Sequence, residues 1–97
     1  MHNFRELNIW KKAMDLANQI LECSTNFPAQ HKFSVTSQLT RSAISIPSNI
    51  SEGSGRGINK DFSRFLDIAQ GSAYELETQM ILSKNFVFLM KKNCKNC

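Results

Sequence analysis

The stretch 37-SQLTRSAISIPSNISEGSGR-56 decides how the middle of this chain folds. Four apolar residues recur in it at steps of four, three and four, the spacing of one face of an α-helix: Leu39, Ala43, Ile46 and Ile50. Pro47 interrupts the stretch without shifting this register, although a proline inside a helix costs roughly 3 kcal/mol. The stretch is therefore a helix kinked at Pro47 or a helix that ends near Ser45. Because Ile50 stays in register, we favour the kinked helix, over about residues 35–53.

Two further amphipathic segments flank this stretch. Before it, a helix is predicted over about residues 5–26 from the stripe of Leu7, Trp10, Met14, Ala17 and Leu21. After it, a helix is predicted over about residues 60–84 from Phe62, Phe65, Ala69, Ala73, Leu76 and Met80. Lys84-Asn85 looks like the end of that helix, and the apolar segment at about 86–93 then begins a fourth one. No β-alternation of useful length occurs, so the predicted fold class is all-α.

The glycines and small residues have several possible roles. Gly53, Gly55 and Gly57 have the wrong spacing for a nucleotide-binding loop, and no lysine–serine or lysine–threonine pair accompanies them. We expect Gly53 to close the middle helix. Gly71 lies in a small-residue patch inside the third predicted helix, where a glycine costs about 1 kcal/mol relative to alanine. Close approach of another helix at Gly71 would offset that cost.

Polar and basic residues around the proline are the candidate functional residues. Asn49 and Glu52 fall near the bend, where they can satisfy freed backbone groups or form pairs with Arg41 or Arg56. Arg41, Arg56 and Lys60 are candidates for a nucleic-acid-binding surface, since the arginine fork bonds two phosphate oxygens at once. The alternative for each of the three is a solvated or ion-paired surface residue.

Composition limits the range of functions. Ninety-seven residues, 41% of them hydrophobic, fit one domain spanning 1–97. No stretch approaches the roughly 20 apolar residues of a membrane span, and the N-terminus has no signal-peptide core, so a cytoplasmic protein is expected. The net charge of +4 is unevenly spread: residues 61–83 sum to −3, and residues 84–97 sum to +4. That pattern suits an anionic partner or subunit contacts between opposite charges.

No residue pattern indicates catalysis, a metal site or a cofactor. Cys94 and Cys97 form a lone C-x-x-C without the second pair of ligands that a zinc site needs. Glu75 and Glu77 are two residues apart, so on a helix they point away from each other and cannot share an acid–base site. We therefore expect a protein that is not an enzyme and that holds no cofactor.

Three stretches together resemble the bacterial four-helix-bundle family of 23S rRNA intervening-sequence proteins, also called S23 ribosomal protein-like. They are FRELNIWKKAMDLA, FPAQHKFSVTSQLTRSAISIPSNISEGSGR and DFSRFLDIAQGSAYELETQM, and the resemblance covers about residues 4–90. It implies an antiparallel up-and-down four-helix bundle, here with a short or incomplete fourth helix. Ser51 stands where many members have alanine, which is a mild change.

The resemblance also implies how such a protein works. Related accessory proteins of diversity-generating retroelements form a basic pentameric barrel that binds nucleic acid and a reverse transcriptase, so a homo-oligomer, specifically a pentamer, is expected. The first hypothesis is an oligomeric helical protein that binds rRNA or other structured nucleic acid through basic surface residues. The alternative is a protein-binding scaffold or accessory subunit without nucleic-acid contact, since an incomplete fourth helix leaves an apolar groove open.

Overall fold

The computed structural model describes the backbone of residues 3–26 and 35–93, with side chains up to Asn85. A short 3-10 helix, η1 (Phe4–Glu6), leads into α1 (Asn8–Ser24), which is followed by α2 (Ser37–Ser54) and α3 (Asn59–Asn93). The described residues contain no strand, so the fold is all-α, as predicted. Residues 27–34, between the first two predicted helices, and the Cys94–Cys97 pair lie outside the described residues.

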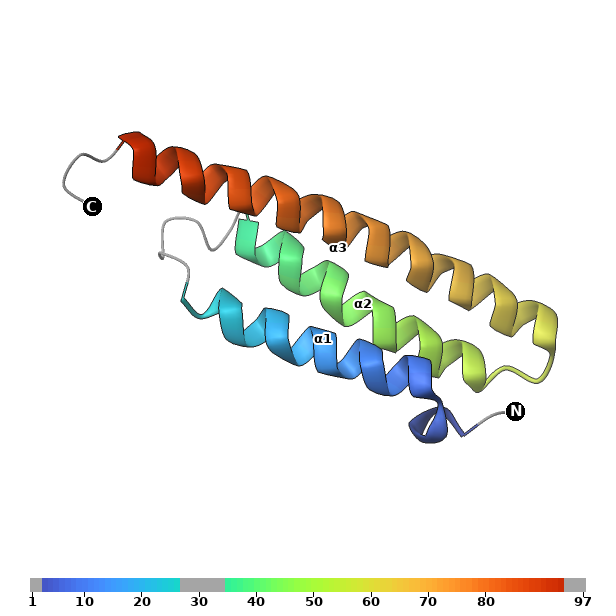
Figure 1. The fold of residues 1–97 in the computed structure, drawn as a ribbon. Helices are drawn as coiled ribbons and strands as arrows, with labels where there is room; N and C mark the ends of the chain where they lie inside the picture. The colour runs from blue at the N-terminus through green and yellow to red at the C-terminus, as the bar shows by residue number, and fades with distance from the viewer. Residues whose placement is uncertain (1–2, 27–34, 94–97) are drawn as a thin grey trace.

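The three helices run alternately up and down, and α2 lies in the middle (Figure 1). It packs along both α1 and α3, whereas α1 and α3 have little direct contact with each other. The start of α1 lies at the same end of the molecule as the turn between α2 and α3 (Figure 1). α2 is consequently covered by α1 on one side and by α3 on the other.

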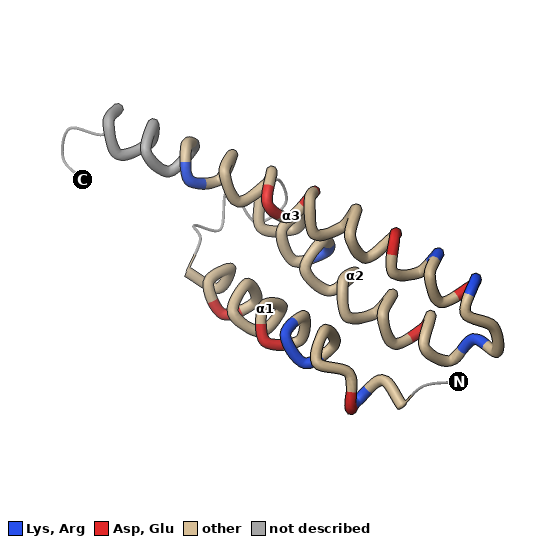
Figure 2. Tube along the Cα trace, turned by 45° about the vertical axis from the view of Figure 1, so that its right-hand side comes forward, with Lys and Arg blue, Asp and Glu red and all other residues tan. Residues whose placement is uncertain are grey.

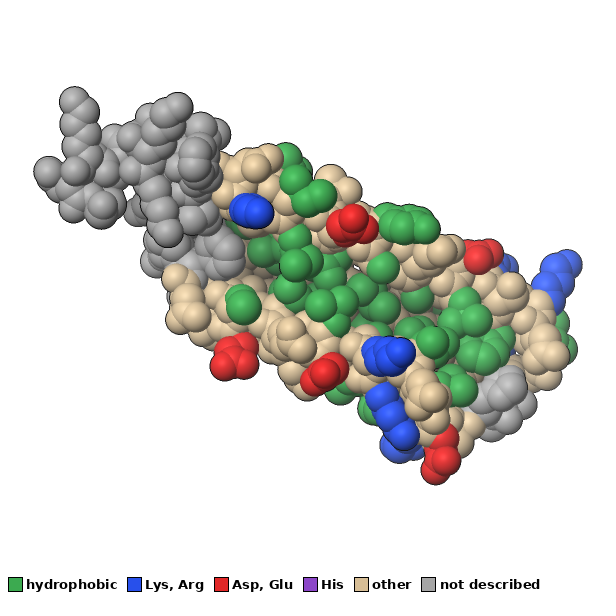
Figure 3. Space-filling view, in the orientation of Figure 1, with side chains coloured by type: hydrophobic (Ala, Val, Ile, Leu, Met, Phe, Trp, Pro, Cys, Tyr) green, Lys and Arg blue, Asp and Glu red, His purple; other side chains and the backbone are tan. Residues whose placement is uncertain are grey.

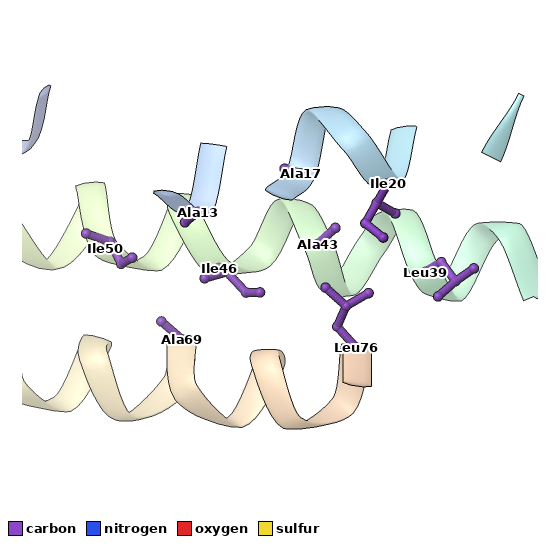
Figure 4. Close-up of a cluster of buried hydrophobic side chains, with 9 residues drawn as sticks. All are labelled: Ala13, Ala17, Ile20, Leu39, Ala43, Ile46, Ile50, Ala69 and Leu76. Carbon is purple, nitrogen blue, oxygen red and sulfur yellow. The ribbon is translucent and has the colours of Figure 1, made fainter. Parts of the chain in front are cut away.

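The core forms where the three helices face one another (Figure 4), and it matches the predicted stripe fully only on α2, since Leu21 and Met80 of the flanking stripes are exposed. The buried side chains are Ala13, Ala17, Ile20, Leu39, Ala43, Ile46, Ile50, Ala69 and Leu76. Four of the nine are alanines, which allow the helices to approach closely but bury little area each. The seam of α2 supplies four members, so the stretch that decides the local fold also lies at the centre of the core.

The structure corrects the predicted helix boundaries at the C-terminal side. The predicted end at Lys84-Asn85 and the separate fourth helix at 86–93 are wrong, because α3 continues without a break to Asn93. Lysine and asparagine are tolerated inside helices, and no glycine or proline follows to stop this one. A four-helix bundle is therefore not formed by the described residues.

The helix also continues through Pro47, so the interpretation in which it ends near Ser45 is wrong. Gly53 does not close α2, which ends at Ser54 with Gly55 as its C-cap. Gly53 instead lies where α3 comes closest: a Cβ built on it would be 2.5 Å from Phe65 Cβ and 3.1 Å from Phe62 Cδ1. The close approach expected at Gly71 is absent there, since a Cβ on Gly71 would meet nothing within 4 Å.

Candidate functional site

An apolar groove, which we call the slot, runs between α1 and α3 over the exposed edge of α2. All three helices line it with aliphatic side chains: Ile9, Ala13 and Leu16 of α1, Ile46 and Ile50 of α2, and Leu66, Ala69 and Ala73 of α3. Lys12 and Gln70 stand at its edges. Figure 3 shows this face as a continuous band of hydrophobic side chains between the two outer helices.

The slot continues along α3 beyond the residues that line its deepest part. Met80 follows Ala73 by seven residues and Leu76 by four, so it lies on the same face of the helix. Its side chain is 45% exposed, and that of Ile9 at the other end of the slot is 49% exposed. Large apolar side chains are thus solvent-exposed at both ends of one continuous apolar surface.

Charged side chains stand near both edges of the slot. Lys12 stands on the α1 edge. On α3, Glu77 follows Ala73 by four residues, and it is exposed. Asp15 and Glu22 of α1 are exposed as well, but they lie about 100° or more around the helix from the lining residue Leu16 and so point away from the slot.

On its other side, α2 is tied to α3 by hydrogen bonds between small polar side chains. The buried Ser42 hydroxyl donates towards Gln79 Oε1 at 2.8 Å and Glu75 Oε1 at 3.0 Å. The hydroxyls of Ser45 and Ser72 are 2.8 Å apart. These bonds and the close contact at Gly53 fix the register of α2 against α3, so the slot is formed by rigid elements.

The structure places Asn49 and Glu52 in local interactions. The Asn49 amide donates to the Ser45 carbonyl oxygen at 2.8 Å and to the Ser45 hydroxyl at 3.0 Å. Glu52 pairs with Arg56 across one helical turn, at 3.3 Å, and both side chains are about half exposed. Each residue contacts a partner one helical turn away, and neither lines the slot.

The three basic candidates do not form one surface. Arg41 lies near the start of α2, and 13 residues of helix, roughly 20 Å, separate it from the end of α2 at Ser54. Arg56 and Lys60 lie at the turn between α2 and α3, where Figure 2 shows Lys and Arg positions gathered. Sequence reasoning missed Arg64, one helical turn beyond Lys60. Its guanidinium carbon lies 6.0 Å from the Phe65 ring centre, and that of Arg56 lies 4.9 Å from the same centre.

Arg56, Lys60 and Arg64 are therefore the basic residues that the structure brings together, and we call them the cationic turn. Glu52 and Asp61 stand among them, so the sum of formal charges at this turn is +3 − 2 = +1. Stacking on Phe65 and the pair with Glu52 already hold the Arg56 guanidinium. Because the net charge is small and the Arg56 guanidinium already has partners, we expect the cationic turn to bind phosphate weakly.

The part of the chain that the structure describes offers neither a metal site nor a membrane span. No group of three or more His, Cys, Asp or Glu side chains is placed to hold a metal ion there. None of the described helices is both long enough and apolar enough to span a membrane. The apolar slot is therefore the candidate functional site.

The architecture and the slot define an all-α protein built from antiparallel helices with an uncovered apolar face. The family model for the 23S rRNA-intervening sequence protein matches residues 5–97, which is nearly the whole chain. The chain belongs to this family, as the residue motifs of the middle stretch indicated. A search of curated proteins finds no match.

Proposed function

We propose that this protein is a non-enzymatic assembly protein whose slot binds an α-helix of a partner subunit. The main support for this proposal is the shape of the slot: α1 and α3 border it, α2 forms its floor, and aliphatic side chains line it. A helix placed there completes a four-helix arrangement, the architecture that the family resemblance implies. Burial of Ile9, Leu16, Leu66 and Met80 against such a helix supplies the driving force.

A homo-oligomer is the simplest assembly of this kind. Exposed apolar side chains also lie outside the slot, at Ile44 beside α1 and at Tyr74 on α3. Several apolar surfaces on one small chain are typical of a protein that buries them against copies of itself. The pentamer implied by the resemblance remains a prediction of stoichiometry, which the experiment below also measures.

The test compares polar substitutions inside and outside the slot. Ile9→Glu and Met80→Glu place a carboxylate at the two ends of the slot, while Ile68→Glu is the matched control. The control side chain is 47% exposed, nearly the same as the 49% of Ile9, but it lies outside the slot lining. Sedimentation velocity over a concentration series measures the association constant of each variant.

Desolvating a carboxylate within a helix–helix contact is costly, and each 1.4 kcal/mol lost weakens association tenfold. We expect at least one slot variant to weaken association tenfold or more, with Ile68→Glu changing it much less. Equal association of all three variants and the wild type, with unchanged helix content by circular dichroism, would show that the slot is not an interface.

The cationic turn supports a second candidate function, which is binding of nucleic acid through phosphate contacts. Lys60 and Arg64 are exposed one helical turn apart, and Arg56 lies beside them. Binding to an rRNA hairpin should then weaken steeply with salt, and replacing Lys60 and Arg64 together by alanine should reduce the slope of that dependence. Replacing Arg41 by alanine is the control, since it lies near the other end of α2. If the double variant and the wild type bind the hairpin with equal affinity at low salt, the cationic turn is not a nucleic-acid-binding surface.

A further inference from the structure

Pro47 lies inside α2, where it removes one hydrogen bond from the helix. Proline has no N–H group, so the carbonyl oxygen of Ala43 receives no bond from residue 47, and the proline ring crowds the preceding turn. The helix nevertheless continues across the proline to Ser54, and the buried Ile50 lies in the part beyond it. Interactions outside the regular backbone pattern are therefore needed to offset the lost bond.

Two polar side chains directly after the proline donate to backbone carbonyls one turn before them. The Ser48 hydroxyl donates to the Ile44 carbonyl oxygen at 2.7 Å, and the Asn49 amide donates to the Ser45 carbonyl oxygen at 2.8 Å. Both carbonyls belong to the turn that the proline ring crowds. Side-chain donors at this point supply hydrogen bonding that the proline itself cannot provide.

The Asn49 amide also begins a chain of hydrogen bonds that reaches α3. Its nitrogen donates to the Ser45 hydroxyl at 3.0 Å, and the hydroxyls of Ser45 and Ser72 are 2.8 Å apart. A carbonyl oxygen only accepts, so the nitrogen end of the Asn49 side chain faces Ser45. A hydroxyl has a single hydrogen, and because the Ser45 oxygen accepts from Asn49, that hydrogen is directed at Ser72.

We propose that Asn49, Ser45 and Ser72 form one relay of hydrogen bonds, which holds the part of α2 after the proline against α3. That part carries Ile50, on the floor of the slot, and Gly53, where the two helices come closest. Asn49 is therefore a positioning residue, which acts on α3 through the Ser45 hydroxyl. The relay does not depend on what the slot binds, so its test is independent of the proposed function.

The relay predicts that substitutions at its two ends are not independent. Among the hydrogen bonds of the described residues, none joins Asn49 to Ser72 directly, so the two are linked through Ser45. The test is a double-mutant cycle of Asn49→Ala and Ser72→Ala, followed by circular dichroism in urea at fixed protein concentration. We expect each single variant to raise the equilibrium constant of unfolding about fivefold. The double variant should raise it less than the product of the two, by roughly threefold or more.

Ser48→Ala is the matched control, because its hydroxyl donates to a carbonyl beside the same proline but lies outside the relay. Combined with Ser72→Ala, it should give the product of the two single effects within about a factor of two. If Asn49→Ala and Ser72→Ala combine in the same multiplicative way, the relay does not exist.

Two further measurements test the role of the Asn49 amide itself. Asn49→Asp keeps the size of the side chain but replaces its donor nitrogen by an oxygen, so it should destabilise at least as much as Asn49→Ala. Hydrogen exchange in Asn49→Ala should speed up about tenfold at the amides from Ile50 to Ser54 relative to those of α1. An Asn49→Asp variant as stable as the wild type would overturn the order of donation. An equal change of exchange in all three helices would overturn the positioning role.

Discussion

Gly53→Ala is the substitution whose effect follows most directly from the structure. A methyl group at residue 53 would lie 2.5 Å from Phe65 Cβ, 3.1 Å from Phe62 Cδ1 and 3.2 Å from Phe65 Cγ. Carbon atoms pack at about 3.5–4.0 Å, so α2 and α3 must separate by roughly 1 Å at this point. The nearest atom is a Cβ, which a change of rotamer cannot move. Overpacking of this kind costs up to about 3 kcal/mol, and the better helix propensity of alanine returns about 1 kcal/mol.

We therefore expect Gly53→Ala to lower the free energy of unfolding by about 2 kcal/mol. The matched control is Gly71→Ala, the same substitution inside α3 at a position where the new methyl group meets nothing within 4 Å. There only the helix propensity acts, so stability should rise by up to about 1 kcal/mol. Urea unfolding followed by circular dichroism at fixed protein concentration measures both variants. Equal or greater stability of Gly53→Ala relative to the wild type would refute the close packing of α2 against α3.

Three smaller predictions concern the core and its polar edge. Leu76→Ala should cost about 3 kcal/mol, because this side chain is only 2% exposed, whereas Leu82→Ala, on an exposed side chain, should cost under about 0.5 kcal/mol. Equal thermal unfolding of these two variants would contradict the assigned core. Ser72→Ala removes the partner of the Ser45 hydroxyl and should cost about 1 kcal/mol in urea unfolding. Glu52→Gln breaks only an exposed ion pair and should stay within about 0.5 kcal/mol of the wild type, so a larger loss would show a further role for this carboxylate.

The helices of the fold were predictable because their apolar periodicity is strong. The seam of Leu39, Ala43, Ile46 and Ile50 is fully buried, as its spacing indicates, and Ile50 in register correctly favoured a helix that passes Pro47. The end of α3 was not predictable in this way. Lys84-Asn85 is a weak stop signal, and whether a helix continues past such a pair depends on the chain around it.

The roles of Gly53 and Gly71 were also predicted wrongly, and the reason is physical. A glycine that ends a helix and one that admits a neighbouring helix look the same in a sequence. Gly53 comes just before Gly55 and was expected to end α2, but it accommodates Phe65. Gly71 was expected to admit another helix and has open space around it. Which partner approaches a glycine is a tertiary property, and no local pattern encodes it.

The candidate site was predicted in part. Arg56 and Lys60 do lie together, but their association with Arg64 depends on the α2–α3 turn and on the ring of Phe65. Arg41 has the same residue type as Arg56 and lies near the opposite end of α2. An apolar groove was anticipated from the expectation of an incomplete fourth helix, whereas the residues that line it are known only once α1 and α3 are placed on either side of α2.

The mass of the wild-type protein in solution tests the central claim, that the slot is covered by a helix of another subunit. Sedimentation equilibrium over a hundredfold range of concentration gives this mass without any substitution. The account predicts a concentration-dependent rise from the 11.0 kDa of a single chain to at least twice that value. A compact 11.0 kDa species at every concentration would contradict it, because the apolar slot would then be stable in contact with water.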